Sequence, residues 1–149
     1  MARLSPHFTL EEMTATEYPV YNKPSEKEIE ALTALCENIL EPIRAHFNLP
    51  ITILSGFRSP ELNKTVGGAA TSQHLKGEAA DITIKGVANA DVWQFIKDNL
   101  NFDQVIAEKL TKHDGSRGWV HVAYSKHQER GDAISFLGAG RYVKGLRFV

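Results

Sequence analysis

The chain has 149 residues, which suits one domain with its own core and is too short for two well-separated enzymatic domains. Its 17 Lys and Arg residues nearly balance 18 Asp and Glu residues, so an electrostatic grip on nucleic acid or on an anionic membrane is not indicated. No apolar run approaches the roughly 18 residues of a membrane span, and none near the start has the form of a signal peptide. We therefore expect a single domain over residues 1–149 that recognises its partner through a local site.

Two capping boxes mark helix starts in the first third of the chain. Thr9 and Glu12 predict a short helix within an otherwise irregular segment over residues 1–24. Ser25 and Glu28 repeat the spacing ahead of apolar residues at helical intervals.

The second capping box predicts the main helix, over residues 26–46. Pro42 lies inside this range and predicts a kink or an early end of the helix, because proline lacks the N–H that an interior position donates. Cys36, the single cysteine, falls in the same amphipathic stretch and is expected to be a buried thiol.

The rest of the chain alternates short apolar runs with polar connections. These runs predict strands over residues 51–54, 80–84, 104–108 and 119–124, and an amphipathic helix over residues 91–100. The stretch from Pro60 to Gln73 carries consecutive small residues and is expected to be a surface loop that lets a ligand approach closely. Because helices precede most strands, we expect an α+β fold with a small, largely antiparallel sheet and helices packed on it. The segment 125–149 has no assigned role, and residues 133–149 are expected to add a final strand.

Three residues form a candidate metal site at one face of this sheet. His74 follows the small-residue loop, Asp81 begins the next strand, and His121 lies in the middle of a later one. A hydrolytic zinc site typically takes three protein ligands of these types and leaves the fourth position for water. Taken singly, each residue is more commonly a hydrogen-bonded core histidine or a turn-forming aspartate.

Three motifs around these residues resemble those of one enzyme family. The string Ser72-Gln73-His74-Leu75-Lys76-Gly77-Glu78-Ala79-Ala80-Asp81 resembles the Ser-x-His-x-x-Gly-x-Ala-x-Asp signature of peptidase family M15, the zinc D,D-peptidases. Ser55-Gly56-Phe57-Arg58-Ser59 and Trp119-Val120-His121 resemble its other two segments, in family order. The resemblance runs from about Phe8 to about Tyr124 and is greatest to the branch found in phage and bacterial genomes.

The resemblance implies one Zn²⁺ per chain, held by His74, Asp81 and His121. It also implies that Arg58 contacts substrate, where a guanidinium can stabilise an oxyanion or a terminal carboxylate. Ser72, Gln73 and Trp119 are further candidates for substrate binding. Ser72 and Gln73 could equally cap the loop or orient the metal ligands, and Trp119 could be packed core.

The general base departs from part of the family. Several branches carry a Glu three residues before the last histidine ligand, whereas this chain has Gly118. Glu108 ends a strand whose hairpin partner would carry His121, and it is the preferred base. Asp103 and His113 are the alternatives. His7, His46 and His127 match no motif and are expected on the surface.

The function implied is hydrolysis of a peptide bond in peptidoglycan stem peptides, by a D,D-carboxypeptidase or a related endopeptidase. We expect a monomer that binds neither nucleic acid nor membrane and acts on the cell wall after release, as a phage lysin or tail-associated protein does. The alternative from another class is a non-catalytic, zinc-stabilised domain that binds peptidoglycan or serves a phage structure. A zinc hydrolase acting on an unrelated small amide is a third possibility.

Overall fold

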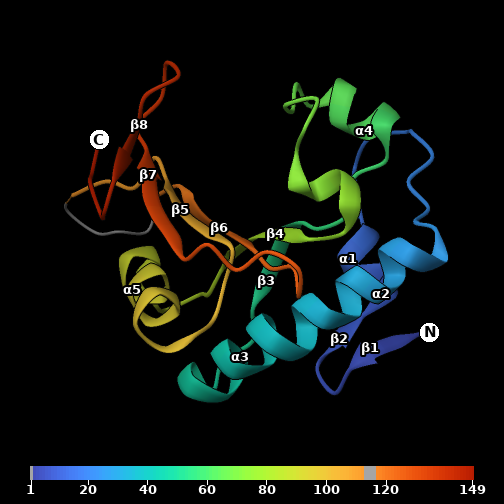
Figure 1. Cartoon of the computed structure of the whole chain (residues 1–149), viewed down its shortest axis with the longest axis horizontal. Helices are drawn as coiled ribbons and strands as arrows, with labels where there is room; N and C mark the ends of the chain where they lie inside the picture. The colour runs from blue at the N-terminus through green and yellow to red at the C-terminus, as the bar shows by residue number, and fades with distance from the viewer. Residues whose placement is uncertain (1, 113–116) are drawn as a thin grey trace.

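The computed structural model describes residues 2–112 and 117–149 (Figure 1). The elements, in chain order, are β1 (Arg3–Ser5), β2 (Phe8–Thr9), α1 (Leu10–Thr14), α2 (Glu26–Leu35), the π-helix η1 (Cys36–Leu40), α3 (Glu41–Phe47), β3 (Thr52–Ser55), α4 (Pro60–Thr65), the 3-10 helix η2 (Gln73–Lys76), β4 (Ala79–Thr83), α5 (Asn89–Asn99), β5 (Gln104–Glu108), β6 (Trp119–Ala123), β7 (Asp132–Phe136) and β8 (Tyr142–Lys144). Within the described residues, none of the helices combines the length and the apolar character that crossing a bilayer requires.

Six strands form the main sheet, in the order β3-β4-β6-β5-β7-β8. All neighbouring pairs run antiparallel except β5 and β7, which are parallel. The chain after β6 therefore crosses β5 to reach β7, and β8 returns beside it. The expected α+β fold with a largely antiparallel sheet is confirmed.

The two faces of the sheet have different roles, because successive side chains of a strand point to opposite sides. One face packs on α5 and on the long helical rod from α2 to α3, which Figure 1 shows along one side of the sheet. Its strand residues in the core are Ala80, Ile82, Val105, Ala107, Val120 and Val122. The alternate residues of the same three central strands, among them Asp81 and His121, face the opposite side.

A kink or an early end was expected at Pro42. The helical rod continues past Pro42 to Phe47, so of these two alternatives the early end is wrong. The distortion that proline imposes lies just before it, where the Glu41 N–H bonds to the carbonyl of Cys36, five residues earlier. A π-turn widens the helix at this point, which accommodates the missing N–H and the ring of Pro42. The predicted capping boxes at Thr9 and Ser25 are both present, and Cys36 is a free, buried thiol.

Three segments carry more regular structure than the sequence indicated. The N-terminal segment contains the β1–β2 hairpin, and the expected loop after Ser59 begins with α4. The tail supplies two strands where one was expected. The first of them, β7, extends the sheet next to β5 and so brings the tail close to the site described below.

Candidate metal centre and active-site cleft

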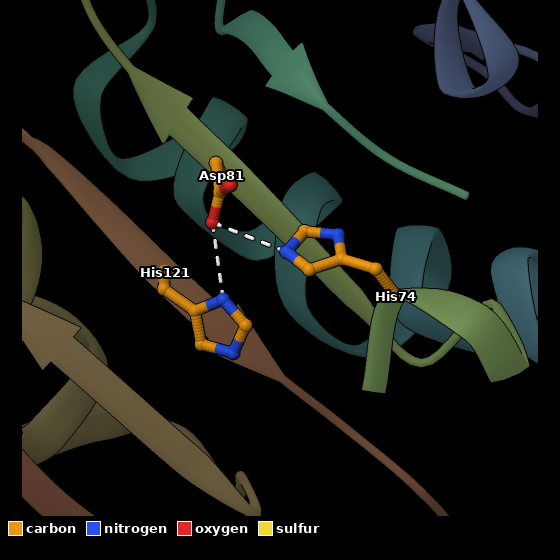
Figure 2. Close-up of side chains that lie close together, drawn as sticks. All are labelled: His74, Asp81 and His121. Atoms are coloured by element: carbon orange, nitrogen blue, oxygen red, sulfur yellow. Dashed lines mark hydrogen bonds and ion pairs between the residues drawn. The ribbon is translucent and has the colours of Figure 1, made fainter. Parts of the chain in front are cut away.

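His74, Asp81 and His121 come together at the open face of the sheet (Figure 2). Each arrives on a different element: η2, β4 and β6. Asp81 and His121 are directly opposite each other in the antiparallel register. Their side chains therefore lie on the same face of the sheet as a cross-strand pair. Each residue offers one ligand atom, and the three atoms lie within 4.8 Å of one another.

The Asp81 carboxylate lies between the two imidazoles. Its Oδ1 is 3.0 Å from Nδ1 of His121 and 3.4 Å from Nε2 of His74. All three residues are at most 8% exposed. Burial raises the pKa of Asp81, but hydrogen bonds from His121 and His74 outweigh this effect and hold it below its usual range. The carboxylate is therefore a ready anionic ligand.

A backbone contact fixes the ring of His74. Its Nδ1 lies 2.7 Å from the carbonyl oxygen of Gly56, and the N–H of Arg58 donates to the carbonyl of His74 at 3.0 Å. A carbonyl only accepts, so Nδ1 carries a proton, and Nε2 is the ring nitrogen directed at Asp81 and at the position of the metal. One carboxylate and two imidazoles, one of them already oriented by a carbonyl, fit the ligand set of a catalytic zinc site.

Arg58 lies directly beside this group. Its Nη2 is 3.3 Å from Oδ2 of Asp81, the carboxylate oxygen that does not face the histidines. Its Nε donates to Ser55 at 3.1 Å, and its Nη1 lies 3.4 Å from Oδ1 of Asn63. The guanidinium thus orients Asp81 while remaining on the wall of the cleft.

The metal group opens into a cleft of about 550 Å³. Besides the three candidate ligands, the predicted site residues that line it are Arg58, Ser72, Gln73, Glu108 and Trp119. Ser72 also caps η2, because its hydroxyl accepts the N–H of His74. His113 lies outside the described residues.

Glu108 shares the face of the sheet that carries His121. Strand register pairs Ile106 with His121 and Glu108 with Trp119, so Glu108 lies one step further along the cleft. Burial raises its pKa above the usual range, and the negative charge of Asp81 acts in the same direction. A carboxylate with a raised pKa is a better proton acceptor than an ordinary one.

The alternative base Asp103 is placed differently. Its side chain is almost fully buried and makes an ion pair with Arg130 at 2.7 Å. Burial raises its pKa, but the hydrogen bonds from Arg130 and Gln73 outweigh this and lower it. Asp103 is thus held as an anion with its oxygens occupied, which makes it the poorer base.

Ile106, Arg130 and Tyr142 are among the lining residues that were not predicted as part of the site. Arg130 lies in the connection between β6 and β7, and Tyr142 begins β8. Neither is near a recognised motif, and only the parallel pairing of β7 with β5 brings them to the cleft. Ile106 could have been found from strand alternation, since it lies between Gln104 and Glu108 on the same face.

The fold and site define a metallopeptidase-like domain, and comparison with known proteins agrees. The model of the family described as Peptidase M15 matches residues 6–123. The chain belongs to the peptidase M15 family, and this membership supports zinc as its metal and a zinc metallopeptidase as its class.

A curated relative is similar over a shorter segment. The zinc D-Ala-D-Ala carboxypeptidase of Streptomyces albus G is 54% identical over 33 residues. The matched segment covers 22% of this chain and 13% of that protein.

Proposed function

We propose that this protein hydrolyses a peptide bond in peptidoglycan stem peptides, as a zinc D,D-carboxypeptidase or a related endopeptidase. The observation that carries the proposal is the group of His74, Asp81 and His121 on the floor of an open cleft, in a chain of the M15 family. The name of the Streptomyces relative supports the substrate class.

Five polar residues of the cleft, namely His74, Asp81, His121, Glu108 and Arg58, have a task in amide hydrolysis. Zinc, when bound by His74, Asp81 and His121, lowers the pKa of water and polarises the scissile carbonyl. Glu108 accepts the proton of the attacking water and returns it to the leaving amine. Arg58 faces the negative charge that develops on the carbonyl oxygen, or the terminal carboxylate of the peptide.

The cleft offers further contacts to a peptide. Ser72 and Gln73 present a hydroxyl and an amide beside His74, and both can hydrogen-bond a peptide backbone. Trp119 lies opposite Glu108 in the strand register and forms part of the wall. Its buried Nε1 has no hydrogen-bond partner among the described residues.

The competing function is a zinc-stabilised domain that binds wall fragments and leaves them intact. Gly118, in place of the glutamate of other branches, is the observation in its favour. Glu108 in the same cleft favours catalysis, because it supplies a carboxylate from the neighbouring strand.

The test compares wild type with His121→Ala and Glu108→Gln, and Glu129→Gln serves as an exposed carboxylate control. Zinc per chain, thermal unfolding with and without added zinc, and release of amino acids from purified peptidoglycan are measured on the same samples. We expect about one zinc in wild type. We expect its loss in His121→Ala, and at least a roughly 100-fold loss of turnover with zinc retained in Glu108→Gln.

Each departure from this pattern has a definite meaning. Activity of Glu108→Gln close to wild type would remove Glu108 from the mechanism. Zinc binding with no cleavage by wild type would favour the binding domain. Cleavage of simple amides but not of wall peptides would point to a different substrate class.

A further inference from the structure

A chain of polar contacts runs from the surface to the far side of His121. It begins at Arg130, in the connection between β6 and β7. The guanidinium makes two hydrogen bonds to the Asp103 carboxylate, Nε to Oδ1 at 2.7 Å and Nη2 to Oδ2 at 3.0 Å. The backbone N–H of Arg130 adds a contact of 3.3 Å to Oδ1. Asp103 is 1% exposed, whereas the Arg130 side chain is 48% exposed, so the pairing is shielded from water on the carboxylate side and open on the guanidinium side.

Asp103 in turn orients the side-chain amide of Gln73. The Gln73 Nε2 donates to Oδ2 of Asp103 at 2.5 Å. A carboxylate accepts and does not donate, so the amide nitrogen faces Asp103 and the amide oxygen faces away from it. That oxygen, Oε1, lies 3.5 Å from Nε2 of His121.

This arrangement orients the ring of His121. An amide oxygen accepts a hydrogen bond, so Nε2 of His121 donates to Oε1 of Gln73. The other ring nitrogen, Nδ1, is then directed at Oδ1 of Asp81 at 3.0 Å and at the position of the metal, and a bound metal would replace the proton that Nδ1 donates to the carboxylate. His74 is held in the corresponding way by the carbonyl of Gly56, so each histidine has its own orienting oxygen.

The connection that carries Arg130 is itself fixed to the sheet. The N–H of Gly131 donates to the carbonyl of Phe102 at 2.9 Å, and the N–H of Asp132 donates to the carbonyl of Asp103 at 3.0 Å. Arg130 follows residue 123, where the family match ends. Its place in the site therefore depends on the tail of this chain.

We propose that Arg130 is a positioning residue of the metal centre, acting through Asp103 and Gln73 to hold the ring of His121 with Nδ1 directed at the metal. The inference rests on the proposed role of His121 as a zinc ligand. Residues that orient metal ligands commonly change metal affinity about 10- to 100-fold when replaced. Because Arg130 acts through two intervening side chains, we expect the lower end of this range.

The test uses the full chain and three variants. Arg130→Gln removes the charge but keeps a polar side chain of similar length, and Arg141→Gln is the control at an exposed arginine of the same tail. Asp103→Asn/Arg130→Gln removes the buried charge together with its partner, in case Arg130→Gln alone fails to fold. Zinc affinity is measured by competition with a chelator. The hydrogen bonding of His121 Nε2 is read from imidazole nitrogen NMR shifts in the metal-free protein, with His121→Ala used to assign the signal.

Arg130→Gln, or the double variant in its place, should bind zinc about tenfold more weakly and show a shifted Nε2 signal of His121, because the hydrogen bond to Gln73 is less well held. Arg141→Gln should match wild type in both measurements. Unchanged zinc affinity in the folded variants would overturn the proposal. Weaker zinc binding with an unchanged His121 signal would also overturn it, since the effect would then be structural only. Neither measurement requires turnover, so a failure here is distinct from a failure of the proposed peptidase activity.

Discussion

The backbone conformation of Gly118 disfavours a side chain at this position, where other branches of the family carry a glutamate. Its φ is +78°, and a Cβ there would overlap the carbonyl oxygen of Glu108. Gly86 has a similar φ of +89° with nothing within 4 Å of the added carbon. We expect Gly118→Ala to lower the free energy of unfolding by at least about 1 kcal/mol more than Gly86→Ala, because only the first adds an overlap to the backbone strain.

Urea unfolding of the two alanine variants beside wild type measures this difference. Equal losses would mean that the start of β6 shifts to relieve the overlap, and a side chain at position 118 would then be tolerated. A larger loss for Gly118→Ala would explain why the carboxylate at the cleft stands on β5 and not immediately before β6.

The candidate ligands could be predicted from the sequence because two signals coincide at them. The motif spacing names His74 and Asp81, and strand alternation gives His121 a definite face. Arg130 could not be predicted in the same way, because an arginine in a polar connection has no periodicity. Its partner Asp103 was considered only as an alternative base, because the pairing of its carboxylate depends on a contact 27 residues away.

At the scale of elements, one capping residue begins α4, the helix that leads into the loop lining the cleft. Ser59 accepts the N–H of Leu62 at 3.1 Å as the N-cap, and its hydroxyl donates to the carbonyl of Tyr21 at 2.8 Å. We expect Ser59→Ala to lower the free energy of unfolding by about 1 to 2 kcal/mol, because it removes both bonds at a buried position. Thr65→Ala, on the exposed end of the same helix, is the control and should cost less.

Chemical denaturation of both variants provides the comparison. A loss for Ser59→Ala no greater than for Thr65→Ala would show that Pro60 and the packing of Leu62 suffice to start the helix.

The elements that the sequence did not predict share a physical cause. The start of α4 is marked in the sequence, since Ser59 precedes a proline at the first helical position. The glycine-rich residues after Thr65 favour a loop, and the whole stretch was therefore predicted as one. The π-turn before Pro42 satisfies a local constraint in a way that periodicity does not specify. The position of β7 depends on a parallel pairing across the sheet, which short-range patterns do not encode.

At the scale of the whole molecule, Glu41 joins the N-terminal hairpin to the helical rod. Its carboxylate accepts the hydroxyl of Ser5 at 2.6 Å and the backbone N–H of His7 at 2.8 Å, and its other oxygen lies 2.6 Å from Nδ1 of His7. These contacts span 34 to 36 positions of the sequence. The capping box at Thr9 predicted where the hairpin leads into α1, but not this long-range attachment.

The same contacts make the stability of the fold depend on pH. Burial raises the pKa of Glu41, but the hydrogen bonds from Ser5 and His7 outweigh it, so the folded-state pKa is lowered. A group with a lowered folded-state pKa stabilises the fold above its unfolded pKa, about 4.3 for glutamate, and loses that contribution as the pH falls through the folded value.

Glutamine does not titrate, so the variant Glu41→Gln has no such contribution to lose as the pH falls. We expect wild type to lose stability more steeply than Glu41→Gln below about pH 4.5, when metal-free protein is unfolded with urea across a pH series. Glu37→Gln, an exposed neighbour on the rod, should keep the wild-type slope. If Glu41→Gln also keeps that slope, the acid sensitivity arises from other carboxylates with lowered pKa, such as Asp81 and Asp103, and the hairpin is attached mainly by its apolar contacts.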